Sequence, residues 1–203
     1  MLKPLTNTFQ TLLEYTWPMI IISIIILVSF RIAFLIKTKG SFSLYKELFM
    51  LLFIIYILAL FQIVTFQDDV TWSTNNFVPF KEIFRYKFNS ILFFKNVLGN
   101  MIMFVPFGFF ISSYLKNDKL PLTLFLTIIA SFSIEVVQLC IGRVFDVDDI
   151  ILNVCGGIIG HYIYIILSKI TNLLPKIFKN ELFLNIISGI FIIIVLIRII
   201  TLI

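Results

Sequence analysis

Five charged residues lie within a fifteen-residue segment of a chain that is otherwise mostly apolar: Glu135, Arg143, Asp146, Asp148 and Asp149. The segment joins the end of one long apolar stretch to the start of the next. A charged side chain at membrane depth costs roughly 2.5 kcal/mol or more, so it is usually retained for a function. Carboxylates beside a guanidinium can perform acid–base chemistry, bind a cation or hold an anion. The segment is therefore a candidate site.

Glu135 shares one helix face with Ser131 and Gln138, because residues three and four apart are neighbours on a helix surface. It lies about six residues inside a helix expected to end near Ile141, which is roughly 9 Å at 1.5 Å per residue. A glutamate at that depth must be protonated, paired or open to a water-filled pocket. Arg143 is the nearest obvious cation in the sequence.

Three aspartates open the next apolar stretch, and capping of a helix N-terminus explains one or two of them. Asp149 is followed by Asn153 four residues later, and then by Gly156 and Gly160 on the same face. This stripe of small residues predicts close helix packing. We expect the packing to bring Asp149 and Asn153 up to the helix that carries Glu135.

Other polar residues surround this region in the sequence. Asn96 and Asn100 lie four apart, and Asn100 is expected to hydrogen-bond into the same pocket. Segment 75–94 combines basic and aromatic residues, which suits a lid that binds a phosphate-bearing lipid head group. An interfacial anchor that binds nothing specific explains the segment equally well. His161, the single histidine, is expected to be a hydrogen-bonded packing residue.

The composition indicates an integral membrane protein, because 60% of the 203 residues are hydrophobic and only 13% are charged. The predicted fold is all-α, a polytopic transmembrane helical bundle of about six spans, each of about 20 residues. These spans are placed at 17–36, 48–66, 97–115, 120–141, 150–168 and 182–202. The first apolar run continues beyond residue 30 without a small-residue cleavage site, so we expect a retained span rather than a removed signal peptide.

The net charge of +5 is interpreted as topological anchoring rather than nucleic-acid binding, since many basic residues lie in short loops. Eight of them lie in the 37–47, 116–119 and 169–181 loops. The positive-inside rule therefore places both termini outside the cytoplasm, together with segments 67–96 and 142–149. Cys140 and Cys155 lack metal-ligand spacing and are expected to be small buried hydrophobes. No cofactor is predicted.

Three motifs, in this order, resemble those of a known family. Residues 75–80 resemble a loop motif Asn-Leu-Ile-Pro-Phe, and residues 100–108 resemble an Asn-x-x-x-Phe-x-Pro-x-Gly span. Residues 131–160 resemble a Ser-x-x-x-Glu-x-x-Gln segment followed by Arg-x-x-Asp-x-x-Asp-x-x-x-Asn-x-x-Gly-x-x-x-Gly. Over residues 47–168 the chain thus resembles the VanZ-like family of bacterial membrane proteins. The predicted regions are this membrane domain, an N-terminal span and basic loop at 1–46, and a basic loop and C-terminal span at 169–203.

The resemblance implies a multi-pass protein of the bacterial plasma membrane that lowers sensitivity to teicoplanin, a lipid-tailed glycopeptide. It supplies no established reaction. The polar set that it carries over is Asn100, Glu135, Gln138, Arg143, Asp146, Asp149 and Asn153.

Three functions follow from these residues. In the first, an outward-facing pocket binds a lipid-tailed molecule or cell-wall precursor, with membrane lipids as the surrounding partners. In the second, Glu135 and Asp149 act as general acid and base on a lipid-linked phosphate or sugar, with Arg143 holding an anion or with Mg²⁺ or Ca²⁺ held by the carboxylates. In the third, the polar residues form a network that only locks the spans together. The two halves of the sequence show no repeated pair of short, interrupted spans, so a transporter is disfavoured.

Overall fold

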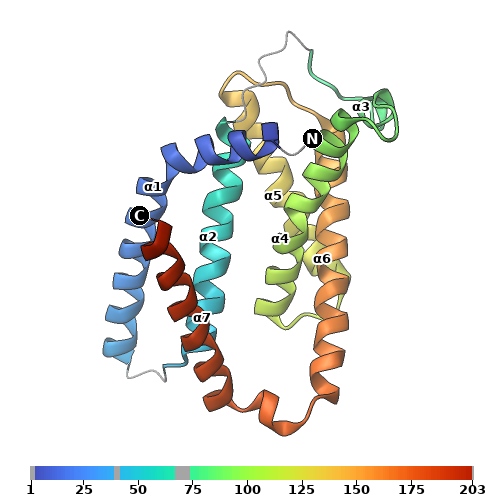
Figure 1. Cartoon of the computed structure of the whole chain (residues 1–203). Helices are drawn as coiled ribbons and strands as arrows, with labels where there is room; N and C mark the ends of the chain where they lie inside the picture. Colours follow the sequence, from blue (N-terminus) through green and yellow to red (C-terminus); the bar gives the residue numbers. More distant parts are fainter. Residues whose placement is uncertain (1–2, 39–41, 67–73, 203) are drawn as a thin grey trace. The chain divides into compact units, whose positions relative to one another are not determined.

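The structure is a computed structural model that describes residues 3–38, 42–66 and 74–202, and no β-strand is found among these residues. Figure 1 shows the helices in chain order. They are α1 (Lys3–Thr38), α2 (Leu44–Phe66), α3 (Lys81–Arg85), η1 (Phe93–Leu98), α4 (Gly99–Leu115), α5 (Leu120–Cys140), α6 (Val147–Leu173), η2 (Lys176–Lys179) and α7 (Glu181–Leu202). Six of the described helices are long and apolar enough to cross a membrane, which confirms the predicted all-α bundle and the position of each span.

The helices extend beyond the apolar windows that predict them. The fifth span is expected at 150–168, yet α6 covers Val147–Leu173. Hydropathy locates only the part of a helix that crosses the hydrocarbon, whereas the helix itself continues until its backbone groups are capped. The start of α6 depends on such a cap, which is described with the site below.

The chain forms two compact units, one of residues 1–62 and 171–203 and the other of residues 63–170. In the first unit, polar contacts join residues at helix ends. Arg31 forms an ion pair with Glu47 at 2.8 Å, and Lys46 forms one with Glu181 at 3.4 Å. This unit holds the first and last predicted spans.

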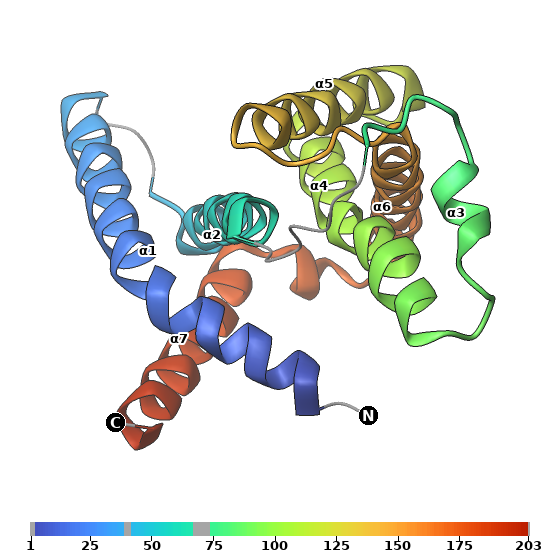
Figure 2. The same ribbon diagram turned by 90° about the horizontal axis from the view of Figure 1, so that it is seen from above.

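In the second unit, α4, α5 and α6 lie beside one another (Figure 2). A Cβ atom added at Gly156 would lie 2.0 Å from the Met101 carbonyl oxygen, and one at Gly160 would lie 2.0 Å from that of Val105. The glycine stripe therefore allows close packing, as predicted, but the two glycines pack against α4 rather than against the helix that carries Glu135. Asn153 nevertheless reaches that helix, as predicted, through its hydrogen bond to Ser131. Contact with α5 is made by the next residue, Gly157, which meets the Thr127 side chain.

The helix α5 carries a buried polar stripe along its length. Thr123, Thr127, Ser131, Glu135 and Gln138 are all buried, with Ser131 and Glu135 at most 1% exposed. The intervening residues of α5 are largely exposed, as expected of a helix with one face toward lipid. The predicted shared face of Ser131, Glu135 and Gln138 is thereby confirmed.

The prediction that both cysteines are buried is wrong. Cys140 at the end of α5 and Cys155 in α6 are free thiols with exposed side chains. A membrane helix can be apolar on both its lipid-facing and its protein-facing sides, so the apolar neighbours of a cysteine do not determine which side it occupies.

A second group of buried polar side chains lies away from the charged segment. The Ser112 hydroxyl lies 2.9 Å from Thr123 Oγ1 and 2.9 Å from His161 Nδ1. We call these three residues the closed cluster; each is at most 1% exposed. His161 is therefore a hydrogen-bonded packing residue, as predicted.

Candidate functional site

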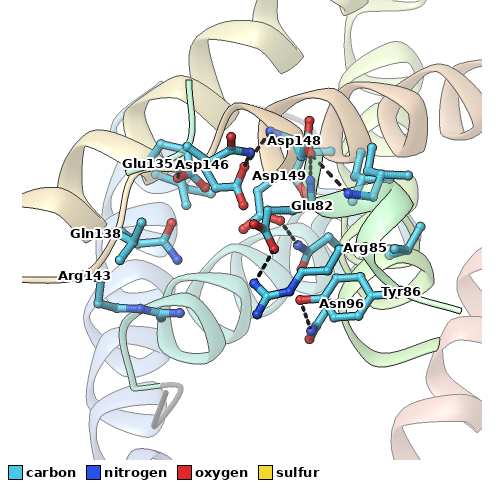
Figure 3. A pocket seen from close by; sticks show the side chains of 18 of the residues that line it. Glu82, Arg85, Tyr86, Asn96, Glu135, Gln138, Arg143, Asp146, Asp148 and Asp149 are labelled. Carbon is cyan, nitrogen blue, oxygen red and sulfur yellow. Dashed lines mark hydrogen bonds and ion pairs between the residues drawn. The ribbon is translucent and has the colours of Figure 1, made fainter. Parts of the chain in front are cut away.

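A cavity of about 570 Å³ lies at the end of the second unit where α6 begins, and all seven predicted site residues line it. The lining comes from the loop around α3, from η1 and α4, and from α5 and α6. Figure 3 shows Glu135, Asp146 and Asp149 with their carboxyl groups directed into this space. The sequence separation of these residues gives no indication of how large the space between them is.

Asp148 holds the loop of α3 against the start of α6. Its carboxylate accepts the backbone N–H groups of Phe80, of Glu82 at 2.7 Å and of Ile83 at 3.2 Å. These are the unpaired N–H groups at the start of α3, so the side chain acts as a cap supplied by another element. Asp148 therefore has a positioning role, although it caps α3 and not the helix that the three aspartates open.

Asp146 caps α6. Its Oδ1 accepts the backbone N–H of Asp148 at 2.9 Å and the Asn76 side-chain amide at 2.8 Å. The Asn76 backbone also pairs with the residues on either side of Asp146, through bonds of 2.8 Å and 3.1 Å. Burial raises the pKa of the Asp146 carboxyl above its ordinary value, and the Asn76 hydrogen bond opposes that shift.

Glu135 has a different hydrogen-bond donor from the one suggested by the sequence. Its Oε2 accepts the backbone N–H of Asp146 at 2.9 Å, whereas Arg143 lines the same cavity within electrostatic range. The donor to Glu135 is therefore a backbone N–H of the turn, whereas the sequence suggests the Arg143 side chain as its partner. The second oxygen, Oε1, has no hydrogen-bond partner in the part of the chain that the structure describes.

Asp149 and Asn153 are held in the same way, by one polar atom each. The Asn100 amide donates to Oδ1 of Asp149, which confirms that Asn100 reaches the pocket. The Asn153 amide nitrogen donates to Ser131 Oγ at 3.0 Å, while its Oδ1 is buried without a partner. Asp149 Oδ2 is likewise without a partner among the described residues.

The segment before η1, and η1 itself, contribute side chains that are absent from the predicted set. Arg85 forms an ion pair with Glu82 at 3.0 Å, and the Asn96 amide donates to the Tyr86 hydroxyl at 2.8 Å (Figure 3). All four residues line the cavity. The signal available in the sequence is the combination of charged and aromatic residues in segment 75–94, but it does not indicate which of them turn inward.

The cavity is acidic. Five carboxyl groups and two guanidinium groups line it, so acidic groups outnumber basic ones by three. Among the described residues no three His, Cys, Asp or Glu side chains are grouped to hold a metal ion. Carboxylates with one unused oxygen each can accept hydrogen bonds from a ligand or exchange protons with it.

The helices and the cavity define a multi-pass α-helical membrane protein with an acidic cavity at one end of a three-helix group. The model of the VanZ/LLP1 family matches residues 49–168, more than half of the chain, and the chain belongs to this family. The resemblance seen in the three motifs is thereby confirmed. Comparisons with curated proteins and with solved structures give no match.

Proposed function

We propose that this protein binds a lipid-tailed or cell-envelope molecule in the cavity, and that binding lowers the sensitivity of the bacterium to lipoglycopeptide antibiotics such as teicoplanin. The observation that carries the proposal is the cavity itself. Pockets for small ligands measure about 300–1,000 Å³, and the cavity of about 570 Å³ lies within that range.

Exposed aromatic side chains beside the cavity support a ligand with an apolar tail. In the segment that covers the cavity, Phe84 is 82% exposed and Phe88 is 85% exposed, and Phe77 is also exposed. Aromatic residues at the end of membrane spans favour the membrane–water interface. A lipid-like molecule can thus place its tail among these residues while its head group enters the cavity.

The orientation follows from the distribution of basic residues. The short loops at 37–47, 116–119 and 169–181 carry eight of them, so we propose that these loops face the cytoplasm of a bacterial plasma membrane. Both termini and the cavity then lie on the outer side, where an antibiotic or a cell-wall precursor is accessible.

This orientation is tested by labelling single cysteines from outside the cell, in a variant from which Cys140 and Cys155 have been removed. Thr74→Cys should react with a membrane-impermeant thiol reagent in intact cells, because Thr74 is exposed beside the cavity. Lys119→Cys, in the turn between α4 and α5, should react only after the membrane is opened. The reverse pattern would place the cavity in the cytoplasm and contradict the proposal.

The function is tested by measuring teicoplanin susceptibility of a sensitive bacterium that expresses the protein, with vancomycin as the comparator. Wild type should lower teicoplanin sensitivity, and Glu135→Gln should return it to that of cells without the protein. The substitution preserves size but removes the ionisable carboxyl group of a side chain that is 1% exposed and lines the cavity.

The matched control is Glu181→Gln, the same change at an exposed carboxyl that does not line the cavity. It should leave the wild-type effect intact at equal membrane levels. If the wild type produces no shift, the antibiotic role is wrong. If Glu135→Gln loses protein and activity in parallel, the carboxyl is structural.

A further inference from the structure

Three oxygen acceptors around the cavity are left without donors by the described residues. They are Glu135 Oε1, Asp149 Oδ2 and Asn153 Oδ1, which we call the acceptor trio. Each belongs to a residue whose other polar atom is fixed by a hydrogen bond, so the side chains are held in place while these oxygens stay available.

The unpaired Oδ1 of Asn153 is the strongest evidence that a ligand binds here. The residue is 5% exposed and lines the cavity, and its Oδ1 is buried without a partner. An unpaired buried acceptor costs about 1–3 kcal/mol, and buried polar atoms in native proteins nearly always have a partner. A bound group that donates hydrogen bonds would remove this cost.

The charge of the cavity favours a cation as that donor. Acidic groups outnumber basic ones by three, so a phosphate or carboxylate placed against the acceptor trio would meet both charge repulsion and further acceptors. Over the described parts of the chain, no three His, Cys, Asp or Glu side chains are grouped to hold a divalent metal ion. A hydroxyl has a single donor, whereas a primary ammonium has three N–H donors and no acceptor.

We propose that the acceptor trio binds the primary ammonium group of an amphipathic ligand, each N–H donating to one of the three oxygens. This inference rests on the proposed function in taking the cavity as a ligand site. Two sources share the chemistry: the head group of an aminophospholipid, and a water-soluble amine from the cell envelope.

The test compares probes on the purified full-length chain in dodecyl maltoside, by isothermal titration calorimetry. Short-chain phosphatidylethanolamine carries the ammonium, and short-chain phosphatidylcholine keeps its charge but replaces every N–H by a methyl group. Short-chain phosphatidylglycerol has hydroxyls and no cation. Phosphatidylethanolamine should bind at least about tenfold more tightly than the other two, since hydrogen bonds to charged groups contribute about 1.5–3 kcal/mol.

A variant then locates the binding to the acceptor trio. Asp149→Asn keeps the size of the side chain and replaces its ionisable carboxyl by an amide, and should weaken phosphatidylethanolamine binding about tenfold or more. Asp118→Asn is the matched control, because Asp118 is exposed and does not line the cavity. Gel filtration and thermal unfolding check folding, and the comparison of probes on the wild-type chain does not depend on any variant.

The outcomes separate the possibilities. Competition by free ethanolamine would support a soluble amine as the source, and binding of the lipid alone would support an aminophospholipid. Equal binding of phosphatidylcholine or phosphatidylglycerol, or no binding of any probe, would overturn the inference. Ammonium binding without any effect on teicoplanin sensitivity would refute the proposed function and leave this inference standing.

Discussion

The second unit contains two groups of polar residues: the closed cluster, joined by side-chain hydrogen bonds, and the acceptor trio, which lines the cavity. In the closed cluster, Ser112 contacts both Thr123 and His161 at 2.9 Å. None of these three residues lines the cavity. Around the acceptor trio, by contrast, each side chain uses one polar atom and leaves another without a partner among the described residues.

The two groups share the helices α5 and α6, so the contrast does not arise from different scaffolds. Along α6, Asp149 and His161 are about 18 Å apart at 1.5 Å per residue. A polar network that only fixes helix positions gains most when its side chains bond to one another, as Ser112 does with Thr123 and His161 in the closed cluster. The structural hypothesis therefore suits the closed cluster, and it also suits the capping roles of Asp146 and Asp148. It leaves the acceptor trio unexplained.

The largest effect on stability is expected from a substitution in the contact between α4 and α6, because both polar groups depend on that packing. Gly160→Ala would place a Cβ atom 2.0 Å from the Val105 carbonyl oxygen and 2.7 Å from the Phe109 backbone nitrogen. Backbone atoms cannot move aside as a flexible side chain can, so α4 and α6 must separate, at a cost of about 3 kcal/mol or more. We expect strongly reduced protein levels in membranes and a lower melting temperature in detergent.

Gly99→Ala is the control for that substitution. A Cβ atom at Gly99 would lie 3.6 Å from the Phe94 carbonyl oxygen, an ordinary contact distance, and alanine favours a helix by about 1 kcal/mol over glycine. This variant should be as stable as wild type or slightly more stable. Wild-type stability of Gly160→Ala would show that the close approach of α4 and α6 is not required.

Much of the membrane bundle could be predicted from the sequence, because hydropathy and helical spacing are local properties. The face shared by Ser131, Glu135 and Gln138 follows from spacing alone. The glycine stripe predicts that some helix packs closely, but nothing in a stripe specifies which one, and the partner proves to be α4.

The contacts that hold the α3 segment beside the cavity could not be predicted in the same way. Asp148 binds backbone N–H groups 65 to 68 residues away, and those donors become available only when α3 forms. Local periodicity carries no information on such contacts. For the same reason the sequence suggests Arg143 as the partner of Glu135, whereas the bound donor is the backbone of Asp146. The functional assignment of the seven predicted residues stays a prediction, to be decided by the experiments above.

A substitution with a smaller expected effect tests whether the closed cluster and the acceptor trio act independently. Ser112→Ala would leave His161 Nδ1 and Thr123 Oγ1 without their bond to the Ser112 hydroxyl, in a place where Ser112 is 0% exposed. We expect a loss of about 1–3 kcal/mol in the free energy of unfolding, seen as a lower melting temperature, because buried unpaired groups retain their desolvation cost. Ser133→Ala, at an exposed serine that donates to the Ile129 carbonyl, should have little effect. Ligand binding and teicoplanin susceptibility per folded molecule should stay at wild-type level in both variants. If Ser112→Ala instead abolished binding while the fold was retained, the closed cluster would be coupled to the cavity, and the contrast between the two groups would not hold.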